Sequence, residues 1–139
     1  MLRRQGIIAL LLAALPCACA LAQNAVSYPG KPIHVIVPYP AGGVVDGLMR
    51  SIGQPVSESV GQTVIVDNRP GANTIIALEA CAKAAPDGYT LCTSSTDGMS
   101  FNPHLYPKLG YDPFKSFTPI ALLAVNQLYL AVNPSLPWR

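Results

Sequence analysis

Charged side chains are scarce in this chain, and their scarcity limits its partners. Asp, Glu, Lys and Arg make up 12% of the 139 residues, and the formal net charge of +2 is matched by Arg3 and Arg4 near the N-terminus. After these two residues, seven Lys and Arg side chains balance seven Asp and Glu side chains. No basic stripe is left to neutralise a phosphate backbone, so we do not expect nucleic acid as a partner.

The motifs of several kinds of site are also missing. There is no CxxC and no cluster of Cys with His, which argues against a metal site. Neither GxxxxGK[S/T] nor GxGxxG occurs, so nucleotide binding has little support. There is no GxSxG elbow, and His34, one of only two histidines, lies in an apolar run. We expect no catalytic residue, no metal and no cofactor, although an acid–base pair built from distant residues stays open.

No apolar run reaches the roughly 20 residues that span a bilayer. The longest begins at residue 6 and ends at 15, after a basic segment at 1–4 and before the small residues of 20–22. This order is typical of a cleaved secretory signal peptide, which we assign to residues 1–22. We therefore expect export to the periplasm and a processed chain that does not cross the membrane.

Only two cysteines remain after this signal. Cys17 and Cys19 lie within it, and neither follows a convincing lipidation motif. Cys81 and Cys92 both have apolar neighbours, which favours two buried free thiols. A disulfide between them is the alternative, because export permits one.

The rest of the chain repeats a strand–loop–helix pattern. Residues 33–37 are mostly β-branched and apolar, as in a strand covered on both faces. Residues 44–60 place apolar side chains three and four positions apart, which predicts a helix despite Pro55, and Gly61 is suited to end it. The same pattern predicts strands at 63–66 and 89–93 and a helix at 74–84, with Thr74 as its N-cap.

The C-terminal part is less regular. We expect an irregular segment at 108–118 that the aromatic side chains of Tyr111, Phe114 and Phe117 anchor. Apolar runs at 119–124 and 128–132 predict two further strands. Residues 133–139 show no helix or strand pattern.

The repeated order predicts the fold class. It is α/β, an open and mostly parallel sheet flanked by helices. Because right-handed crossovers put the carboxyl ends of all parallel strands at one edge, the loops at 38–43, 67–73 and 94–98 should meet there. Ligands of open α/β sheets bind at this edge.

These loops suit an anion. Gly42 and Gly43 let the backbone approach a ligand, and the following helix offers unpaired N–H groups, although a plain turn is the alternative. Asp46 either caps that helix or holds a polar ligand group. Arg69 either pairs with a ligand carboxylate or ties the loop to its own acids, and Asn68 is equally ambiguous. Hydroxyl groups at 93–96 supply neutral donors.

Eight stretches together resemble a known family, the substrate-binding proteins of tripartite tricarboxylate transporters, also called the Bug family. They occur in the family's order and spacing over nearly the whole processed chain. The stretches are Tyr28-Pro29-x-Lys31-Pro32-Ile33, Val37-Pro38-Tyr39-Pro40-Ala41-Gly42-Gly43-x-x-Asp46, Gly61-Gln62-x-Val64, Asn68-Arg69-Pro70-Gly71-Ala72, Ala85-Pro86-Asp87-Gly88-Tyr89-Thr90-Leu91, Asn102-Pro103-x-Leu105-Tyr106, Tyr111-Asp112-Pro113 and Phe117-x-Pro119-Ile120.

The resemblance implies a periplasmic-binding-protein fold with two α/β domains that close on a small carboxylate and deliver it to membrane transporter subunits. Such proteins are about twice as long, so we expect only the first domain here, at 23–132, with 133–139 a truncated crossover toward a missing second domain. This truncation should leave a weak or absent affinity and an unpaired sheet edge. The implied ligand contacts are Tyr39, Ala41, Gly42, Gly43, Asp46, Ala72, Asn73, Thr74 and Ser95.

One departure from the family concerns the second loop. Relatives usually read Pro-Gly-Ala-Gly-Gly there, whereas this chain has Asn73 and Thr74 in place of the last two glycines. The added side chains should narrow the approach to the loop and change ligand choice or disable binding. Two alternatives to a binding protein remain, a small exported enzyme acting on a carboxylate and a non-functional fragment.

Overall fold

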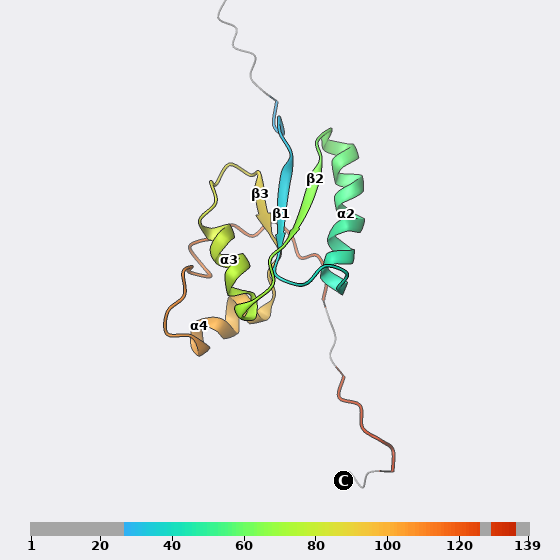
Figure 1. Cartoon of the computed structure of the whole chain (residues 1–139), viewed down its shortest axis with the longest axis vertical. Coiled ribbons are helices and arrows are strands. Elements are labelled where there is room, and N and C mark those ends of the chain that lie inside the picture. The colour runs from blue at the N-terminus through green and yellow to red at the C-terminus, as the bar shows by residue number, and fades with distance from the viewer. Residues whose placement is uncertain (1–26, 126–128, 136–139) are drawn as a thin grey trace, which may run out of the picture.

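A computed structural model describes residues 27–125 and 129–135 of the chain (Figure 1). The predicted signal peptide at 1–22 lies outside the described residues. A central sheet of three parallel strands has the order β2-β1-β3. These strands are β1 (Ile33–Val37), β2 (Val64–Asn68) and β3 (Thr90–Cys92). The predicted α/β class and parallel sheet are therefore confirmed.

The two long helices form where the apolar periodicity places them. Helix α2 (Val44–Val60) has the predicted bounds, continues through Pro55 and ends at Gly61, whose φ of 69° is the left-handed value that favours glycine. Helix α3 (Ile75–Ala82) is shorter than expected. Three short elements complete the set: the 3-10 turn η1 (Ala72–Thr74), the π-helical η2 (Asp97–Phe101) and α4 (Asn102–Leu105).

The core lies on both faces of β1. Val35 and Val37 point to one face and pack with Met49 of α2 in a buried apolar cluster. On α3, Ala77 and Leu78 are completely buried. Figure 1 shows α2 and α3 on either side of the sheet, which is the arrangement that two right-handed crossovers in opposite directions produce. The central strand is thus covered on both faces, as its nearly continuous apolar run predicts.

A disulfide joins α3 to β3. Cys81 and Cys92 are bonded, with their Cα atoms 6.2 Å apart. The expectation of two free thiols was therefore wrong. Apolar neighbours alone cannot distinguish the two states, because the pairing depends on α3 packing against β3 within the Cα distance that a disulfide spans.

Two of the family-like stretches contact each other at the amino ends of the strands. The hydroxyl of Tyr28 donates to the carbonyl of Gly88 at 2.8 Å, and the amide of Gly30 donates to the hydroxyl of Tyr89 at 2.8 Å. Lys31 lies 4.3 Å from the centroid of the Tyr89 ring. These contacts tie the chain before β1 to the turn before β3, so both stretches serve the fold at the edge opposite the predicted ligand loops.

The predicted strands at 119–124 and 128–132 do not form in the part of the chain that the structure describes. Their side chains are largely exposed, with Leu122 at 83% and Leu130 at 91%. An apolar run becomes a strand only beside another strand that accepts its hydrogen bonds, and none of the three described strands pairs with these residues. No helix among the described residues has the length and apolar character needed to cross a membrane.

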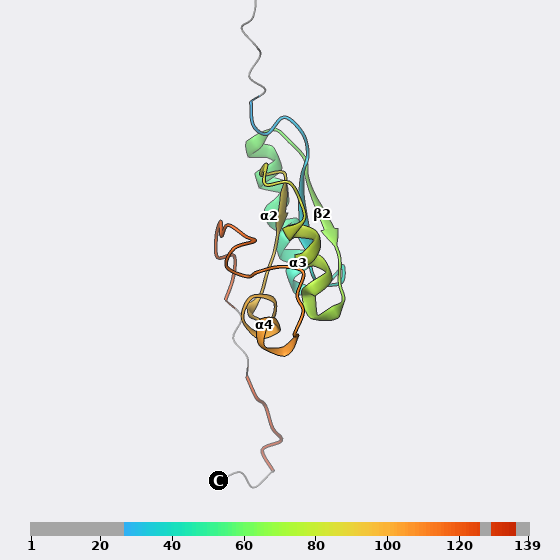
Figure 2. The same ribbon diagram turned by 90° about the vertical axis from the view of Figure 1, so that its left-hand side faces the viewer.

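The irregular segment at 108–118 is anchored by fewer aromatic side chains than expected. Tyr111 is buried and packs edge to face on Phe117, whose ring centroid is 5.7 Å away. Phe114 is 91% exposed, so its predicted anchoring role is wrong. Phe114 instead lies in a turn in which its amide donates to the carboxylate of Asp112 at 2.9 Å. Figure 2 shows this segment passing close to α3 and α4.

Candidate functional site

The three loops that follow the strands meet at one end of the sheet, as predicted from the topology. The hydroxyl of Tyr39, after β1, donates to Oγ of Ser95, after β3, at 2.9 Å. The side-chain amide of Asn68, at the end of β2, donates to the carbonyl of Tyr39 at 3.0 Å. In Figure 1 all three strands point toward this end, where α3 begins. We call this end the carboxyl rim.

The first loop exposes backbone at the start of α2. Ala41, Gly42 and Gly43 are all exposed, and Gly42 has a φ of 80°, which a residue with a Cβ rarely adopts. Gly43 is the N-cap of α2 and offers no side chain to its free amides. The first-turn amides therefore lack an intrahelical partner and a capping side chain, and the positive end of the helix dipole lies behind them.

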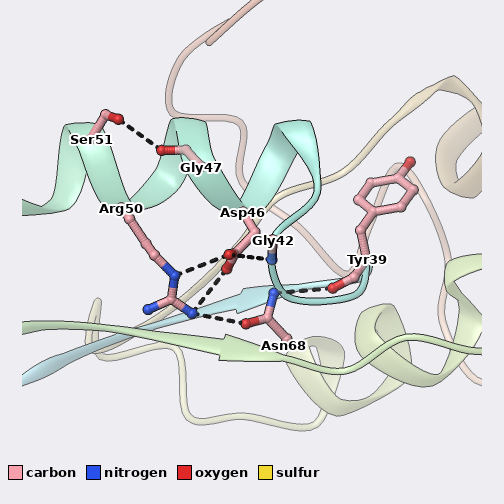
Figure 3. A network of polar contacts seen from close by, with 7 residues as sticks. All are labelled: Tyr39, Gly42, Asp46, Gly47, Arg50, Ser51 and Asn68. Carbon is pink, nitrogen blue, oxygen red and sulfur yellow. Dashed lines mark hydrogen bonds and ion pairs between the residues drawn. The ribbon is translucent and has the colours of Figure 1, made fainter.

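Asp46 is held by the protein and not directed at solvent (Figure 3). Its side chain is almost completely buried, and Oδ2 accepts hydrogen bonds from the amide of Gly42 at 2.8 Å and from Nε of Arg50 at 3.0 Å. Oδ1 forms an ion pair with Nη2 of Arg50 at 2.9 Å. These contacts, the Arg50 hydrogen bond first, lower the pKa of Asp46 to about 2. Of the two roles considered for this carboxylate, the structure supports the one that fixes the start of α2.

Arg50 is a site residue that the sequence interpretation missed. Its Nη2 also donates to Oδ1 of Asn68 at 3.1 Å, so the side chain links helix α2 to the end of β2. Asn68 in turn holds the carbonyl of Tyr39. The spacing of Asp46 and Arg50, four residues apart on a predicted helix, was an available signal for this ion pair. The chain of contacts makes the first loop, α2 and β2 one connected unit, shown in Figure 3.

Arg69 is tied to its own loop. Its Nε donates to Oδ2 of Asp67 at 2.8 Å, and Nη2 lies 2.8 Å from the same oxygen. Of the two roles left open for Arg69, pairing with a carboxylate of its own loop is the one observed in the structure. Both side chains are partly exposed, so this pair stabilises the fold only slightly.

The second loop has an unusual backbone. Ala72, Asn73 and Thr74 have φ angles of 46°, 50° and 72°, the only positive values among described residues other than glycine. A left-handed conformation costs a residue with a Cβ about 1–2 kcal/mol. Thr74 is expected to cap α3 but makes no side-chain capping bond. It is buried, and its Oγ1 has no hydrogen-bond partner among the described protein atoms.

This backbone reverses its handedness at the start of α3. Thr74 is left-handed, with φ 72° and ψ −8°, whereas Ile75 is right-handed, with φ −58° and ψ −44°. Successive residues of opposite handedness can turn their N–H groups toward a common point, but here the amide of Ile75 donates to the carbonyl of Ala72 within the turn and is not free for a ligand. Helix α3 starts at the same place and adds the positive end of its dipole.

The third loop supplies hydroxyl groups. Ser95 accepts from Tyr39, as described above, and Thr93 is buried with an Oγ1 that has no partner among the described protein atoms. The loop lies close to α3, since a Cβ added to Gly98 would lie 2.9 Å from Oγ1 of Thr74 and 3.3 Å from Oγ of Ser94. The second and third loops are therefore in direct contact at the rim.

Other kinds of site have less support. Within residues 27–125 and 129–135, no three His, Cys, Asp or Glu side chains come together in a group that could hold a metal ion. An open hollow of about 260 Å³ lies between α2 and β2, on the flank of the domain and outside the three loops. It is lined by Arg50, Gly53, Gln54, Ser57, Val64 and Val66.

The fold and the rim thus define an open α/β domain whose strand-end loops meet at one edge. A family model described as the tripartite tricarboxylate transporter family receptor matches residues 48–139, more than half of the chain. The chain belongs to this family. The resemblance seen in the eight sequence stretches is therefore confirmed.

Curated relatives and solved structures agree with this assignment. The chain is 37% identical over 129 residues to the UPF0065 protein in the tcbD-tcbE intergenic region of Pseudomonas sp. (strain P51), covering 93% of this chain and 38% of the relative. It is 38% identical over 114 residues to the protein BugT of Bordetella pertussis, covering 81% of this chain and 35% of BugT. The chain therefore spans less than half the length of these relatives.

Three solved structures share the fold. The periplasmic binding protein BugD matches with a TM-score of 0.63 and 40% identity over 67% of this chain and 31% of its own. MatC of Rhodopseudomonas palustris, solved with bound malate, matches with a TM-score of 0.65 and 38% identity, over 69% of this chain and 33% of its own. Rpa4515 of R. palustris, solved with adipate, matches with a TM-score of 0.59 and 36% identity, over 62% of this chain and 29% of its own. Members of the family are solute-binding receptors, and their location is the periplasm.

Proposed function

We propose that this chain captures a small carboxylate in the periplasm for a tripartite tricarboxylate-type transporter and catalyses no reaction. The observation that carries the proposal is the meeting of three loops at the carboxyl rim, joined by the 2.9 Å contact between Tyr39 and Ser95. The start of α2 brings amides without a capping side chain to this rim, the start of α3 adds the positive end of its dipole, and hydroxyl groups add neutral donors. Such groups stabilise a carboxylate without a permanent positive charge.

Relatives support the chemical class of the ligand. One structural neighbour was solved with malate and another with adipate, both dicarboxylates. By similarity, the ligand contacts proposed for this chain are Tyr39, Ala41, Gly42, Gly43, Ala72, Asn73, Thr74 and Ser95. We assign Asp46 a supporting role, since its carboxylate is already paired with Arg50 and, as an anion, would repel a bound carboxylate.

The proposal is tested by titrating the ¹⁵N-labelled chain with malate and adipate and following its amide signals by nuclear magnetic resonance. This method also detects weak binding, with Kd of about 1 mM. The expected result is a saturable shift of amides at 41–47 and 72–77 with either dicarboxylate. Dimethyl malate is the control, because esterification removes both negative charges from a molecule of similar shape.

Two outcomes would contradict the proposal. The first is the absence of any saturable shift with malate, adipate or other small carboxylates. The second is an equal response to dimethyl malate, which would show that the site does not recognise charge. Recovery of chemically altered malate after incubation would instead support a small exported enzyme.

A further inference from the structure

A pair of side-chain amides lies directly behind the second loop. Oδ1 of Asn102 accepts from Nδ2 of Asn73 at 2.7 Å, and Nδ2 of Asn102 donates to the backbone carbonyl of Asn73, also at 2.7 Å. Asn102 is fully buried at the start of α4, 29 residues along the chain from its partner. One side chain therefore grips both the side chain and the main chain of Asn73.

Asn102 is itself fixed by Tyr111. The hydroxyl of Tyr111 donates to the carbonyl of Gly98 at 2.6 Å and lies 3.4 Å from Nδ2 of Asn102. Tyr111 is buried, so these groups exchange little with water. Three segments of the chain, around residues 73, 98–102 and 111, are thus joined by one internal network.

The grip on Asn73 determines where the next amide points. A trans peptide unit is planar, so the carbonyl of one residue and the N–H of the next point in opposite directions. Because Asn102 holds the Asn73 carbonyl inside the protein, the N–H of Thr74 is turned the other way. Thr74 begins the left-handed to right-handed step at the start of α3.

The side chain of Asn73 adds to this effect. Asparagine tolerates the left-handed region better than other residues with a Cβ, and here its amide also bonds to Asn102. A glycine at this position would adopt the same φ but would lack the second hydrogen bond. Asn73 therefore makes the loop more rigid than the family's usual glycine would.

We propose that Asn102 is a positioning residue of the carboxylate site, which holds residues 72–74 in the turn that orients the amide of Thr74 at the start of α3. The side chain of Asn73, through its own hydrogen bond to Asn102, restricts the loop to one conformation. The inference rests on the proposed function for its ligand, but the orientation of the amides is a property of the chain alone.

The test compares two variants of the purified ¹⁵N-labelled chain. Asn102→Leu removes both hydrogen bonds and keeps the same branching of heavy atoms, whereas Val35→Ala weakens the core of the sheet far from the loop. With malate as the probe, Asn102→Leu is expected to lower the affinity about tenfold and to shift the amide signals of Thr74 and Ile75. Val35→Ala should lower the unfolding temperature but leave the affinity and these two signals nearly unchanged.

A third variant separates the two hydrogen bonds between Asn73 and Asn102. Asn73→Gly keeps the carbonyl that Asn102 grips, so its loss of affinity should be smaller, about two- to threefold. If Asn102→Leu does not fold, Asn102→Ser replaces it, since the serine hydroxyl is too short to reach the Asn73 carbonyl.

The outcomes distinguish this inference from the proposed function. If Asn102→Leu binds malate as tightly as the parent, or if Val35→Ala loses as much affinity, the positioning role is refuted. If the parent binds no carboxylate, the proposed function fails and the amide signals alone decide the inference. In that case, shifted signals of Thr74 and Ile75 in Asn102→Leu support it, and unchanged signals overturn it.

Discussion

Thr74 is a residue whose type is poorly suited to its backbone conformation, so replacing it with glycine should stabilise the protein. It is a β-branched residue with a φ of 72°, and it is buried with an unpartnered hydroxyl. The substitution Thr74→Gly removes both unfavourable features at once and places at this position the residue that the backbone suits.

The expected size of the effect is a difference between opposing terms. Relief of the left-handed backbone is worth about 1–2 kcal/mol, and removal of a buried, unpaired hydroxyl about 1–3 kcal/mol. Loss of the two buried carbons, Cβ and Cγ2, costs about 1.6 kcal/mol, and the greater freedom of glycine in the unfolded chain costs about 0.5–1 kcal/mol. The balance favours Thr74→Gly by about 1 kcal/mol, which corresponds to a rise of about 4 °C in unfolding temperature for a domain of this size.

Thr93 offers a matched control. It is equally buried, at 8% exposure against 5% for Thr74, and its hydroxyl also lacks a partner, but its φ is not positive. Thr93→Gly therefore makes the same chemical change without the relief of the backbone. Urea unfolding followed by circular dichroism should find Thr74→Gly more stable than Thr93→Gly by about 1–2 kcal/mol. If the two variants are equally stable, the argument from backbone conformation is wrong.

Three further predictions concern the contacts that hold the rim and the sheet. The pKa of Asp46 is lowered to about 2. Its contribution to the free energy of unfolding is therefore complete above its pKa in the unfolded chain, about 4, and is lost as the pH falls toward 2. Between about pH 5 and 2, the urea midpoint of unfolding should decline less steeply in Asp46→Asn than in the parent. The disulfide closes a loop with a sequence separation of 11, so Cys81→Ala with Cys92→Ala should lower the free energy of unfolding by about 3 kcal/mol; a free thiol at either position in the unreduced parent would contradict the pairing. A Cβ at Gly98 would clash with Leu78, so Gly98→Ala should cost about 1–3 kcal/mol in the same urea assay, whereas Gly47→Ala, which meets no neighbour within 4 Å, serves as its control.

The left-handed turn also bears on the family's sequence pattern. Two glycines at positions 73 and 74 would adopt the observed φ angles without strain. This chain replaces them with Asn73, which gains a bond to Asn102, and with Thr74, which makes no such bond. The departure anticipated from the sequence therefore also changes the hydrogen bonding of the loop.

Local pattern was sufficient to predict the main elements and their arrangement. The alternation of a β-branched strand with a helix of 3.6-residue period depends on neighbouring residues only, so β1 and α2 form where the sequence placed them. The handedness of crossovers then brought the three loops to one rim without any knowledge of side-chain contacts. Residues 39, 42, 43 and 95 were placed at that rim correctly for the same reason.

The remaining features depend on residues that are distant in the chain. The bond between Cys81 and Cys92 and the grip of Asn102 on Asn73 exist because packing brings these pairs together, and no local period encodes such a distance. The apolar run at 119–124 shows the converse, since its composition suits a strand but no neighbouring strand lies beside it. Sequence alone thus determined the order of the elements and the edge that carries the site. Tertiary contacts decided the shape of that edge, because strained backbone and paired side chains persist only where surrounding structure holds them.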